Sequence, residues 1–175
     1  MYDSNEISKC PLVVARFEKI REELYKNLVK ENGWDVIKYE DIKSPCRATH
    51  YSAGYDFCSP MDIHLEPNES VLVPTFIRCK MNEDVVLILA PRSSLGVKYH
   101  MILSNTVGVI DADYYDNSTT EGHIYVSITN LGNKTIDISA GDRFCQGILM
   151  PYYRAVNDDL NSMNTREGGF GSTNK

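Results

Sequence analysis

Two carboxylates stand two residues apart where an apolar stretch ends, in the sequence Asn105-Thr106-Val107-Gly108-Val109-Ile110-Asp111-Ala112-Asp113-Tyr114. If the alternation of a strand continues through them, Asp111 and Asp113 share a face, and one can act as a general base while the other is solvated or structural. The same pattern also fits two solvated carboxylates at a strand end. Tyr114 adds a flat ring that suits a base or a sugar, and equally the edge of a core.

Two turns offer donors for an anionic ligand. The segment Ala90-Pro91-Arg92-Ser93-Ser94-Leu95-Gly96 leaves an apolar strand and presents a guanidinium and two hydroxyls within one turn. Together with backbone N–H groups, these donors can cradle phosphate oxygens. The segment Ala140-Gly141-Asp142-Arg143-Phe144-Cys145-Gln146-Gly147 turns tightly into a strand that carries Gln146, whose amide can donate to a phosphate. An ordinary Ser-rich turn and an ordinary Gly-Asp turn stay open as alternatives.

Two further segments have an unusual composition. Ser52-Ala53-Gly54-Tyr55-Asp56-Phe57 sets an acidic residue between aromatic residues after a glycine, and a turn with a solvated Asp is the alternative. Arg166-Glu167-Gly168-Gly169-Phe170-Gly171-Ser172-Thr173 sets one aromatic residue among three glycines. Its backbone freedom permits close approach to phosphates, and Phe170 can cover a base by stacking. It is not a Walker A loop, because no Lys precedes Ser172. A disordered Gly-rich tail is the alternative.

Strands must position these segments. From Arg47 onward, short runs with a period of two residues are separated by turn residues, which is typical of an all-β sandwich or barrel with little helix. The predicted strands contain Ile63–Leu65, Val71–Val73, Val85–Leu89, Ile124–Thr129, Ile136–Ile138 and Phe144–Met150. Val85–Leu89 is apolar throughout, which predicts a strand that is buried on both faces.

The N-terminal segment carries the one convincing helical pattern. The segment Leu12–Asn32 has an apolar residue at every fourth position and a glycine after its end: Ile20, Leu24, Leu28 and Gly33. This spacing predicts an amphipathic helix that stops at the glycine. Val13–Phe17 can instead form a short strand, so the start of the helix stays open.

The composition is that of one globular domain of 175 residues, with 42% apolar and 24% charged residues. The longest apolar run, Val85–Pro91, is far shorter than the roughly 18 residues of a membrane helix, and the first residues do not resemble a secretion signal. A formal net charge of −6 without a cluster of Lys or Arg argues against broad binding to nucleic acid or to an anionic membrane. Five cysteines without a C-x-x-C pair predict reduced thiols in a cytosolic protein and no zinc site.

Together and in this order, the five segments resemble the five motifs of the trimeric deoxyuridine triphosphatases (dUTPases). The matching letters are A-G-Y-D, P-R-S-S-L, G-V-I-D-x-D-Y, G-D-R-x-x-Q and G-G-F-G-S-T. The resemblance covers about Arg47 to Thr173. It implies an all-β fold with a jelly-roll or β-clip barrel as catalytic domain over residues 46–156. An N-terminal extension with a helix precedes it over residues 1–45, and a flexible C-terminal arm follows over residues 157–175.

The resemblance also implies cleavage of dUTP between its α- and β-phosphates, which yields dUMP and pyrophosphate. This reaction limits uracil in DNA and supplies dUMP for dTTP synthesis. A triphosphate with about four negative charges meets a chain of net charge −6, so Mg²⁺ is expected to offset the repulsion. Asp56 matches the residue that reaches Mg²⁺ through a bound water. A homotrimer whose sites are shared between subunits is also expected from the resemblance. The cysteines and the net charge predict a cytoplasmic location, with neither nucleic acid nor membrane as a direct partner.

The resemblance assigns the catalytic and phosphate-binding roles residue by residue. Asp111 falls where the family's general base orients and deprotonates the water that attacks the α-phosphorus. Arg92 matches the residue that holds this carboxylate. Ser93 matches the donor to the β-phosphate, while Ser94 and Gln146 match contacts to the phosphate chain.

The nucleoside is assigned to the third motif. Asn105 matches the residue that helps to hold the water and uracil, and Tyr114 matches the ring that lies against deoxyribose and leaves no room for a 2′-hydroxyl. Tyr125, on the returning strand, belongs to the hairpin that reads the edge of uracil. The backbone of that hairpin is contributed by Gly108, Val109 and Ile110.

The last motif is expected to close the site. Phe170 would cover uracil, while the γ-phosphate is held by Arg166, Gly171, Ser172 and Thr173. Arg166 precedes Phe170 by four residues, whereas five are commoner in the family. A second departure is the insertion Tyr115–Glu121, which stands where most relatives have a short Arg-Gly step.

Two alternatives differ in chemistry. The related dCTP deaminases share the fold and the R-S-S turn, but their reaction needs a Glu on the strand after the third motif. Ile124–Asn130 carries no Glu, which argues against deamination. A trimeric regulatory protein without catalysis is the other alternative, and the presence of Asp111, Tyr114 and Gln146 argues against it.

Overall fold

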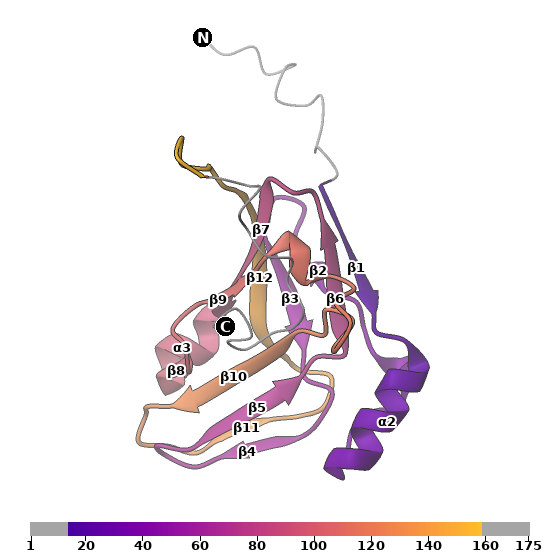
Figure 1. Cartoon of the computed structure of the whole chain (residues 1–175). Coiled ribbons are helices and arrows are strands. Elements are labelled where there is room, and N and C mark those ends of the chain that lie inside the picture. Colours follow the sequence, from indigo (N-terminus) through magenta and orange to yellow (C-terminus); the bar gives the residue numbers. More distant parts are fainter. Residues whose placement is uncertain (1–13, 159–175) are drawn as a thin grey trace.

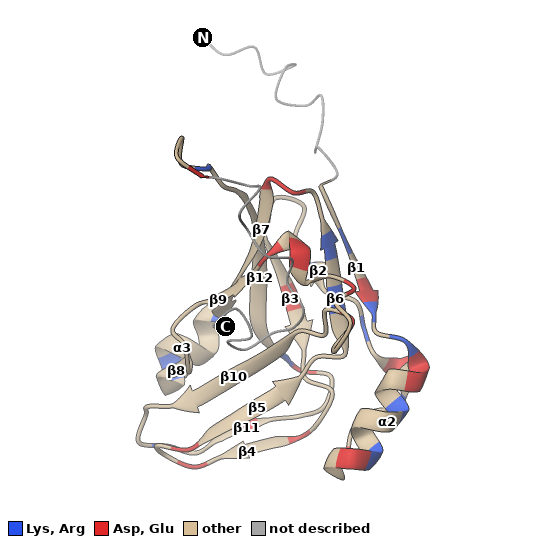
Figure 2. Ribbon diagram, viewed as in Figure 1, with Lys and Arg blue, Asp and Glu red and all other residues tan. Residues whose placement is uncertain are grey.

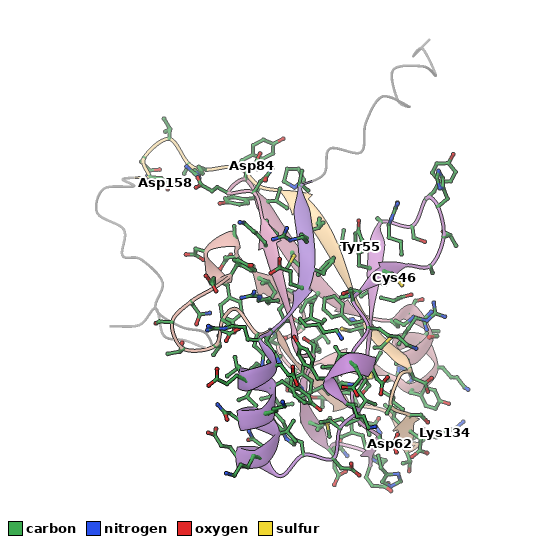
Figure 3. The ribbon with its side chains drawn as sticks, turned by 90° about the vertical axis from the view of Figure 1, so that its right-hand side faces the viewer. Cys46, Tyr55, Asp62, Asp84, Lys134 and Asp158 are labelled. Carbon is green, nitrogen blue, oxygen red and sulfur yellow. The ribbon has the colours of Figure 1, made fainter. Side chains whose placement is uncertain are left out.

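Antiparallel strands make up most of the protein in this computed structural model, which describes residues 14–158 (Figure 1). The largest sheet has five strands, in the order β2-β3-β12-β7-β9. Their bounds are Cys46–Arg47 for β2, Gly54–Cys58 for β3, Arg143–Pro151 for β12, Val85–Pro91 for β7 and Gly108–Ile110 for β9. Cys46 and Tyr55 mark the β2–β3 edge of this sheet in Figure 3.

Three smaller sheets complete the fold. One has three strands in the order β5-β10-β8, and two have two strands each, β11-β4 and β1-β6. The bounds are Ser70–Pro74 for β5, Tyr125–Asn130 for β10, Met101–Leu103 for β8, Ile136–Ile138 for β11, Ile63–Leu65 for β4, Ala15–Lys19 for β1 and Ile77–Met81 for β6. The helical elements are α2 (Glu22–Asn32), α3 (Ser93–Tyr99) and the 3₁₀ turns η1 (Tyr39–Asp41) and η2 (Ala112–Tyr114). The predicted all-β, jelly-roll class is confirmed.

Alternating burial explains why these segments form strands. In β10, Val126 and Ile128 are buried while their neighbours are half-buried, which gives one apolar face with the period of a strand. The prediction for β7 was wrong in one respect. Leu87 and Leu89 are buried, whereas Val86 and Ile88 are half-buried and line a cavity, so in the single chain only one face of β7 is fully covered.

The N-terminal helix is shorter than the pattern predicts. Among the described residues, those from Val14 to Arg21 are not part of it, because α2 begins at Glu22. The alternative of a strand is confirmed for Ala15–Phe17, and the strand continues to Lys19. The strand forms because β6 offers a free edge, to which β1 pairs along its whole length. The helix stops at Gly33, as predicted, and this residue adopts the left-handed conformation at φ 64°.

The core lies between the sheets and extends under α2. Phe57, Phe76 and Phe144 are fully buried, and Ile20 and Tyr25 bring the N-terminal segment into the same cluster. The four cysteines of the described range are free, and desolvation raises the pKa of the buried Cys79 thiol to about 12. Within residues 14–158, no helix is both long and apolar enough to cross a bilayer.

A buried amide joins the end of β10 to two other elements. Asn130 Nδ2 donates to the carbonyls of Leu65 on β4 and of Lys134, each at 2.9 Å. Asn130 Oδ1 accepts the Gly132 N–H at 2.9 Å. The side chain therefore satisfies two backbone carbonyls and one backbone N–H.

We expect Asn130→Ala to lower the free energy of unfolding by about 2 to 4 kcal/mol, because it removes three hydrogen bonds made by a fully buried side chain. Chemical denaturation measures this change, with the exposed neighbour Asn133→Ala as the control. Equal stability of the two variants would contradict the role given to Asn130.

Candidate active site

A cavity of about 640 Å³ is lined by β8, β9, β10 and the loops between them. Its apolar wall consists of Leu72, Leu89, Leu103 and Val126, and Ser104 and Ser127 add hydroxyls. Six of the residues assigned to the nucleoside from the sequence line this one cavity: Asn105, Gly108, Val109, Ile110, Tyr114 and Tyr125. The structure therefore brings the third motif and the returning strand together around one space.

A tight turn between β8 and β9 shapes the entrance. Thr106 adopts a left-handed φ of 65°, and its N–H donates to the Leu103 carbonyl at 2.7 Å. Gly108 then lies directly opposite Leu89 of β7. A Cβ at Gly108 would stand 3.0 Å from the Leu89 Cβ, so the missing side chain permits the close approach of the two strands. Asn105 is left exposed at the rim.

Two tyrosines form the inner part of the cavity. Tyr114 is 6% exposed, and its hydroxyl donates to the His123 carbonyl at 2.8 Å. Burial raises the pKa of Tyr125 to about 12, which keeps its phenol neutral at ordinary pH. The insertion between these tyrosines does not separate them, since both line the same cavity.

The insertion Tyr115–Glu121 is ordered by one amide side chain. Asn117 Nδ2 donates to the Tyr114 carbonyl at 2.8 Å, while Asn117 Oδ1 accepts the backbone N–H of Thr120 at 2.9 Å. Gly122 follows at φ 82°, where a Cβ would lie 2.8 Å from the Tyr114 carbonyl oxygen. The loop thus returns the chain to β10 without disturbing Tyr114.

The insertion is anchored to the N-terminal segment by charged contacts. Glu121 accepts hydrogen bonds from the backbone N–H of Arg21 at 3.0 Å and from its Nε at 2.6 Å, at the start of α2. Tyr115 donates to Glu18 Oε2 at 2.6 Å, and this bond is the main cause of the lowered Glu18 pKa. The Arg78 guanidinium lies over the Tyr115 ring at 4.9 Å. The insertion and the N-terminal segment, which both lie outside the five motifs, therefore hold each other in place.

A second group of predicted residues gathers around Asp56 on β3. The Asp56 carboxylate is 8% exposed and contacts Arg92 Nε at 3.3 Å and Arg143 Nη1 at 3.1 Å. Gln146 lies opposite Asp56 in the ladder between β12 and β3. Arg92 precedes α3, whose first residues, Ser93 and Ser94, are exposed. Two guanidinium groups against one carboxylate give this cluster the excess of positive charge that an anion needs.

Sequence reasoning assigned no role to Arg143, although it is the R of the fourth motif. Its contact with Asp56 comes from β12 pairing with β3, a long-range register that no local pattern reports. The Arg in the G-D-R turn was the one signal that could have indicated it.

Asp111 lies away from the Asp56 cluster within a single chain. In the pairing of β7 with β9, Leu87 faces Ile110, so Asp111 follows at the Val86 end of β7 while Arg92 follows its other end. At about 3.3 Å per residue, the backbones of Arg92 and Asp111 are about 20 Å apart along the sheet. An arginine side chain does not span this separation, so Arg92 does not reach Asp111 of its own chain.

Asp111 and Asp113 line a second cavity, of about 780 Å³. Its cationic lining residues are Lys80 and Arg154, and its hydrophobic wall includes Val86 and Ile88 of β7. Figure 2 shows the acidic colour of η2 close to the basic colour of β6. Val109 belongs to both cavities, which places Asp111 at the boundary between them.

The last motif lies outside the described residues. Arg166, Phe170, Gly171, Ser172 and Thr173 therefore have no place in this geometry, and their roles stay predictions. The same holds for most of the arm predicted over residues 157–175.

We expect Glu121→Gln to lower the midpoint of thermal unfolding by about 2 to 4 °C, since it removes the charge that anchors the insertion to Arg21. Scanning calorimetry measures the shift. Glu31→Gln, an exposed position near the end of α2, is the control and should change the midpoint by less than about 1 °C. The anchoring role is wrong if the two variants unfold at the same temperature.

Comparison with known proteins gives a consistent family. The dUTPase family model matches residues 40–174. A deoxyuridine 5'-triphosphate nucleotidohydrolase from Lactococcus lactis is 38% identical over 148 residues, which is 83% of this chain and 99% of that protein. One from Hahella chejuensis is 36% identical over 139 residues, covering 76% of this chain and 88% of the relative.

Solved structures agree. The crystal structure of the dUTPase from Streptococcus mutans aligns with a TM-score of 0.64 at 34% identity, covering 79% of this chain and 97% of that one. The dUTPase from phage phi11 of S. aureus, whose structure visualises a species-specific insert, has the same fold at 19% identity and a TM-score of 0.61, covering 87% of this chain and 99% of that chain. The chain belongs to the dUTPase family.

Proposed function

We propose that this protein hydrolyses dUTP to dUMP and pyrophosphate. The observation that carries the proposal is the cavity that joins Asn105, the β9 backbone and two tyrosines, with Asp111 immediately after β9. Membership of the dUTPase family supports the same reaction. In the cell, the reaction would keep uracil out of DNA and supply dUMP for dTTP synthesis.

The cavity suits a deoxynucleoside. The backbone of Gly108, Val109 and Ile110 offers N–H and C=O groups to the edge of uracil, with Tyr125 as the facing ring. Tyr114 is proposed to lie against the sugar. Its hydroxyl is held by the His123 carbonyl, so the ring cannot easily move aside for a 2′-hydroxyl. Asn105, at the rim, is proposed to hold the attacking water as well as uracil.

Asp111 is the proposed general base. It would take a proton from the water that attacks the α-phosphorus in line, and pyrophosphate leaves from the opposite side. Its position at the boundary of the two cavities supports this role. With the nucleoside bound in the first cavity, the α-phosphate would lie outside that cavity and close to Asp111. No covalent nucleophile is needed.

The phosphate chain is proposed to lie on the Asp56 cluster of a neighbouring subunit. Arg92 would complete the surroundings of Asp111 there, Ser93 would donate to the β-phosphate, and Ser94 and Gln146 would contact the chain. Arg143 adds a second guanidinium beside Arg92. The separation of about 20 Å between Arg92 and Asp111 along one sheet supports a homotrimer whose sites are shared between subunits.

Mg²⁺ is the proposed cofactor. Within residues 14–158, no three His, Cys, Asp or Glu side chains gather as a metal site. A single carboxylate such as Asp56 suits a Mg²⁺ ion that is held mainly by water and substrate phosphates, which is how the ion usually binds. Asp56 would reach it through a bound water. When bound, the ion neutralises charge that develops on the leaving pyrophosphate.

Two features argue against deamination of dCTP. β10 (Tyr125–Asn130) carries no Glu, and the nearest one along the chain, Glu121, is engaged by Arg21. Release of pyrophosphate from dUTP, compared with release of ammonia from dCTP, decides between the two reactions. A regulatory protein without catalysis would release neither product.

The free thiols support the cytoplasm as the proposed location. Neither nucleic acid nor membrane is proposed as a direct partner.

The arm is proposed to close over the bound nucleotide. Phe170 would cover uracil, and the γ-phosphate would be held by Arg166, Gly171, Ser172 and Thr173. Closure would exclude water and strengthen polar contacts around the α-phosphorus.

We expect Asp111→Asn to lower kcat by roughly 10² or more, because it removes the proposed general base. Binding of a non-hydrolysable dUTP analogue should change little. Pyrophosphate release measures turnover, and Asp113→Asn is the control for the loss of one carboxylate from the same cavity. Near-normal turnover of Asp111→Asn would remove Asp111 from the mechanism.

Mixing two inactive variants tests the shared sites. Asp111→Asn and Arg92→Gln are each expected to be inactive, but mixed trimers contain some sites that take Asp111 from one variant and Arg92 from the other. Equal random mixing should restore about a quarter of the normal activity. Each site takes Asp111 from one chain and Arg92 from another, and each of these residues is intact in about half of the chains. Mixed trimers, verified by native mass spectrometry, that stay inactive would contradict sharing between Arg92 and Asp111.

A further inference from the structure

A fully buried histidine lies behind the two tyrosines of the nucleoside cavity. His123 belongs to none of the five motifs and stands between the insertion and β10. Its ring is stacked on Phe76, with centroids 5.3 Å apart and planes inclined by 18°. On the cavity side, its ring centroid lies 4.0 Å from that of Tyr125. The imidazole therefore fills the space between the core and one wall of the cavity.

Hydrogen bonding determines the form of this ring. The backbone N–H of Phe76 donates to His123 Nε2 at 2.9 Å, so Nε2 carries a lone pair and the proton is on Nδ1. Nδ1 is buried and has no hydrogen-bond partner among the described residues. Desolvation lowers the His123 pKa to about 3, which keeps the ring neutral at ordinary pH. Its contribution is thus one of shape and hydrogen bonding and not of charge.

The backbone N–H that His123 Nε2 accepts belongs to a residue with an unusual backbone conformation. Phe76 has a left-handed φ of 55°, and it lies between the end of β5 at Pro74 and the start of β6 at Ile77. Its buried amide finds its acceptor in the imidazole. A phenylalanine at position 123 would fill the same space but leave this amide without a partner.

His123 also holds Tyr114, the other tyrosine of the cavity. The His123 carbonyl accepts the Tyr114 hydroxyl at 2.8 Å. Tyr114 and Tyr125 come from either side of the insertion, and His123 contacts both of them: Tyr114 through its backbone carbonyl and Tyr125 through its ring. The spacing of the two aromatic walls thus depends on where His123 sits.

We propose that His123 is a positioning residue of the nucleoside cavity, which fixes the Tyr125 ring against the bend at Phe76 and thereby sets the fit of the deoxynucleoside. The inference rests on the proposed function. It goes beyond the motifs, because the groups that touch the nucleotide are the tyrosines and His123 acts through them.

Two substitutions separate positioning from folding. His123→Gln keeps an acceptor for the Phe76 amide but removes the ring, and we expect it to raise KM for dUTP about three- to tenfold with kcat within about twofold. His123→Phe keeps a ring against Tyr125 but removes the acceptor. We expect it to lower the midpoint of thermal unfolding while KM stays within about twofold of normal.

A double-mutant cycle gives the same test without His123→Phe, in case that variant does not fold. If His123 acts through Tyr125, adding His123→Gln to Tyr125→Leu should raise KM no further. A normal KM for His123→Gln, additive effects in the cycle, or an equal rise of KM in the Gln and Phe variants would each overturn the inference. Wild-type protein that does not hydrolyse dUTP would instead refute the proposed function on which the inference depends.

Discussion

The register of β7 is the constraint on which the proposed site depends. This strand pairs with β12 on one side and with β9 on the other, and it carries Arg92 just beyond one end. Asp111 leaves β9 at the opposite end. The two side chains that the proposed mechanism brings to one substrate are therefore held apart by the length of a strand in each chain. On this proposal, a complete site needs a second copy of the sheet, which would make assembly a part of the chemistry.

The distribution of charge follows from the same separation. The chain has a formal net charge of −6, yet it is proposed to bind a triphosphate. The positive charge for this ligand is concentrated in one cluster. Asp56, which is buried, contacts both Arg92 and Arg143, and this leaves one positive charge in excess. The carboxylates Asp111 and Asp113 line a cavity away from this basic cluster. Within one chain, the acidic and the basic groups of the proposed site are therefore separate, and the proposed assembly would bring them together.

The residues of the candidate site could be selected from the sequence because their types and spacing are local, while their roles came from the family resemblance and stay predictions. The turn at Arg92, the carboxylate at Asp111 and the alternation through β10 each need only a short window of sequence. Long-range pairing could not be predicted in this way. The sequence left helix and strand open for Val13–Phe17, and the strand β1 formed because the edge of β6 was available for pairing.

The contacts of Arg143, Glu121 and His123 were equally out of reach of sequence reasoning. Each depends on a partner distant in the chain: Asp56, Arg21 and Phe76 respectively. An isolated histidine without ligand spacing carries no signal that its ring will support a tyrosine. Packing partners of this kind become visible only when the sheets are assembled.

The central claim, that one site is built from more than one chain, is tested most directly by a crystal structure of the assembled protein with Mg²⁺ and a non-hydrolysable dUTP analogue. The account predicts that the nucleoside lies in the cavity of one subunit, beside its Asp111, while its phosphates contact Arg92 of a neighbouring subunit. A nucleotide that contacts Asp111 and Arg92 of the same chain would contradict it.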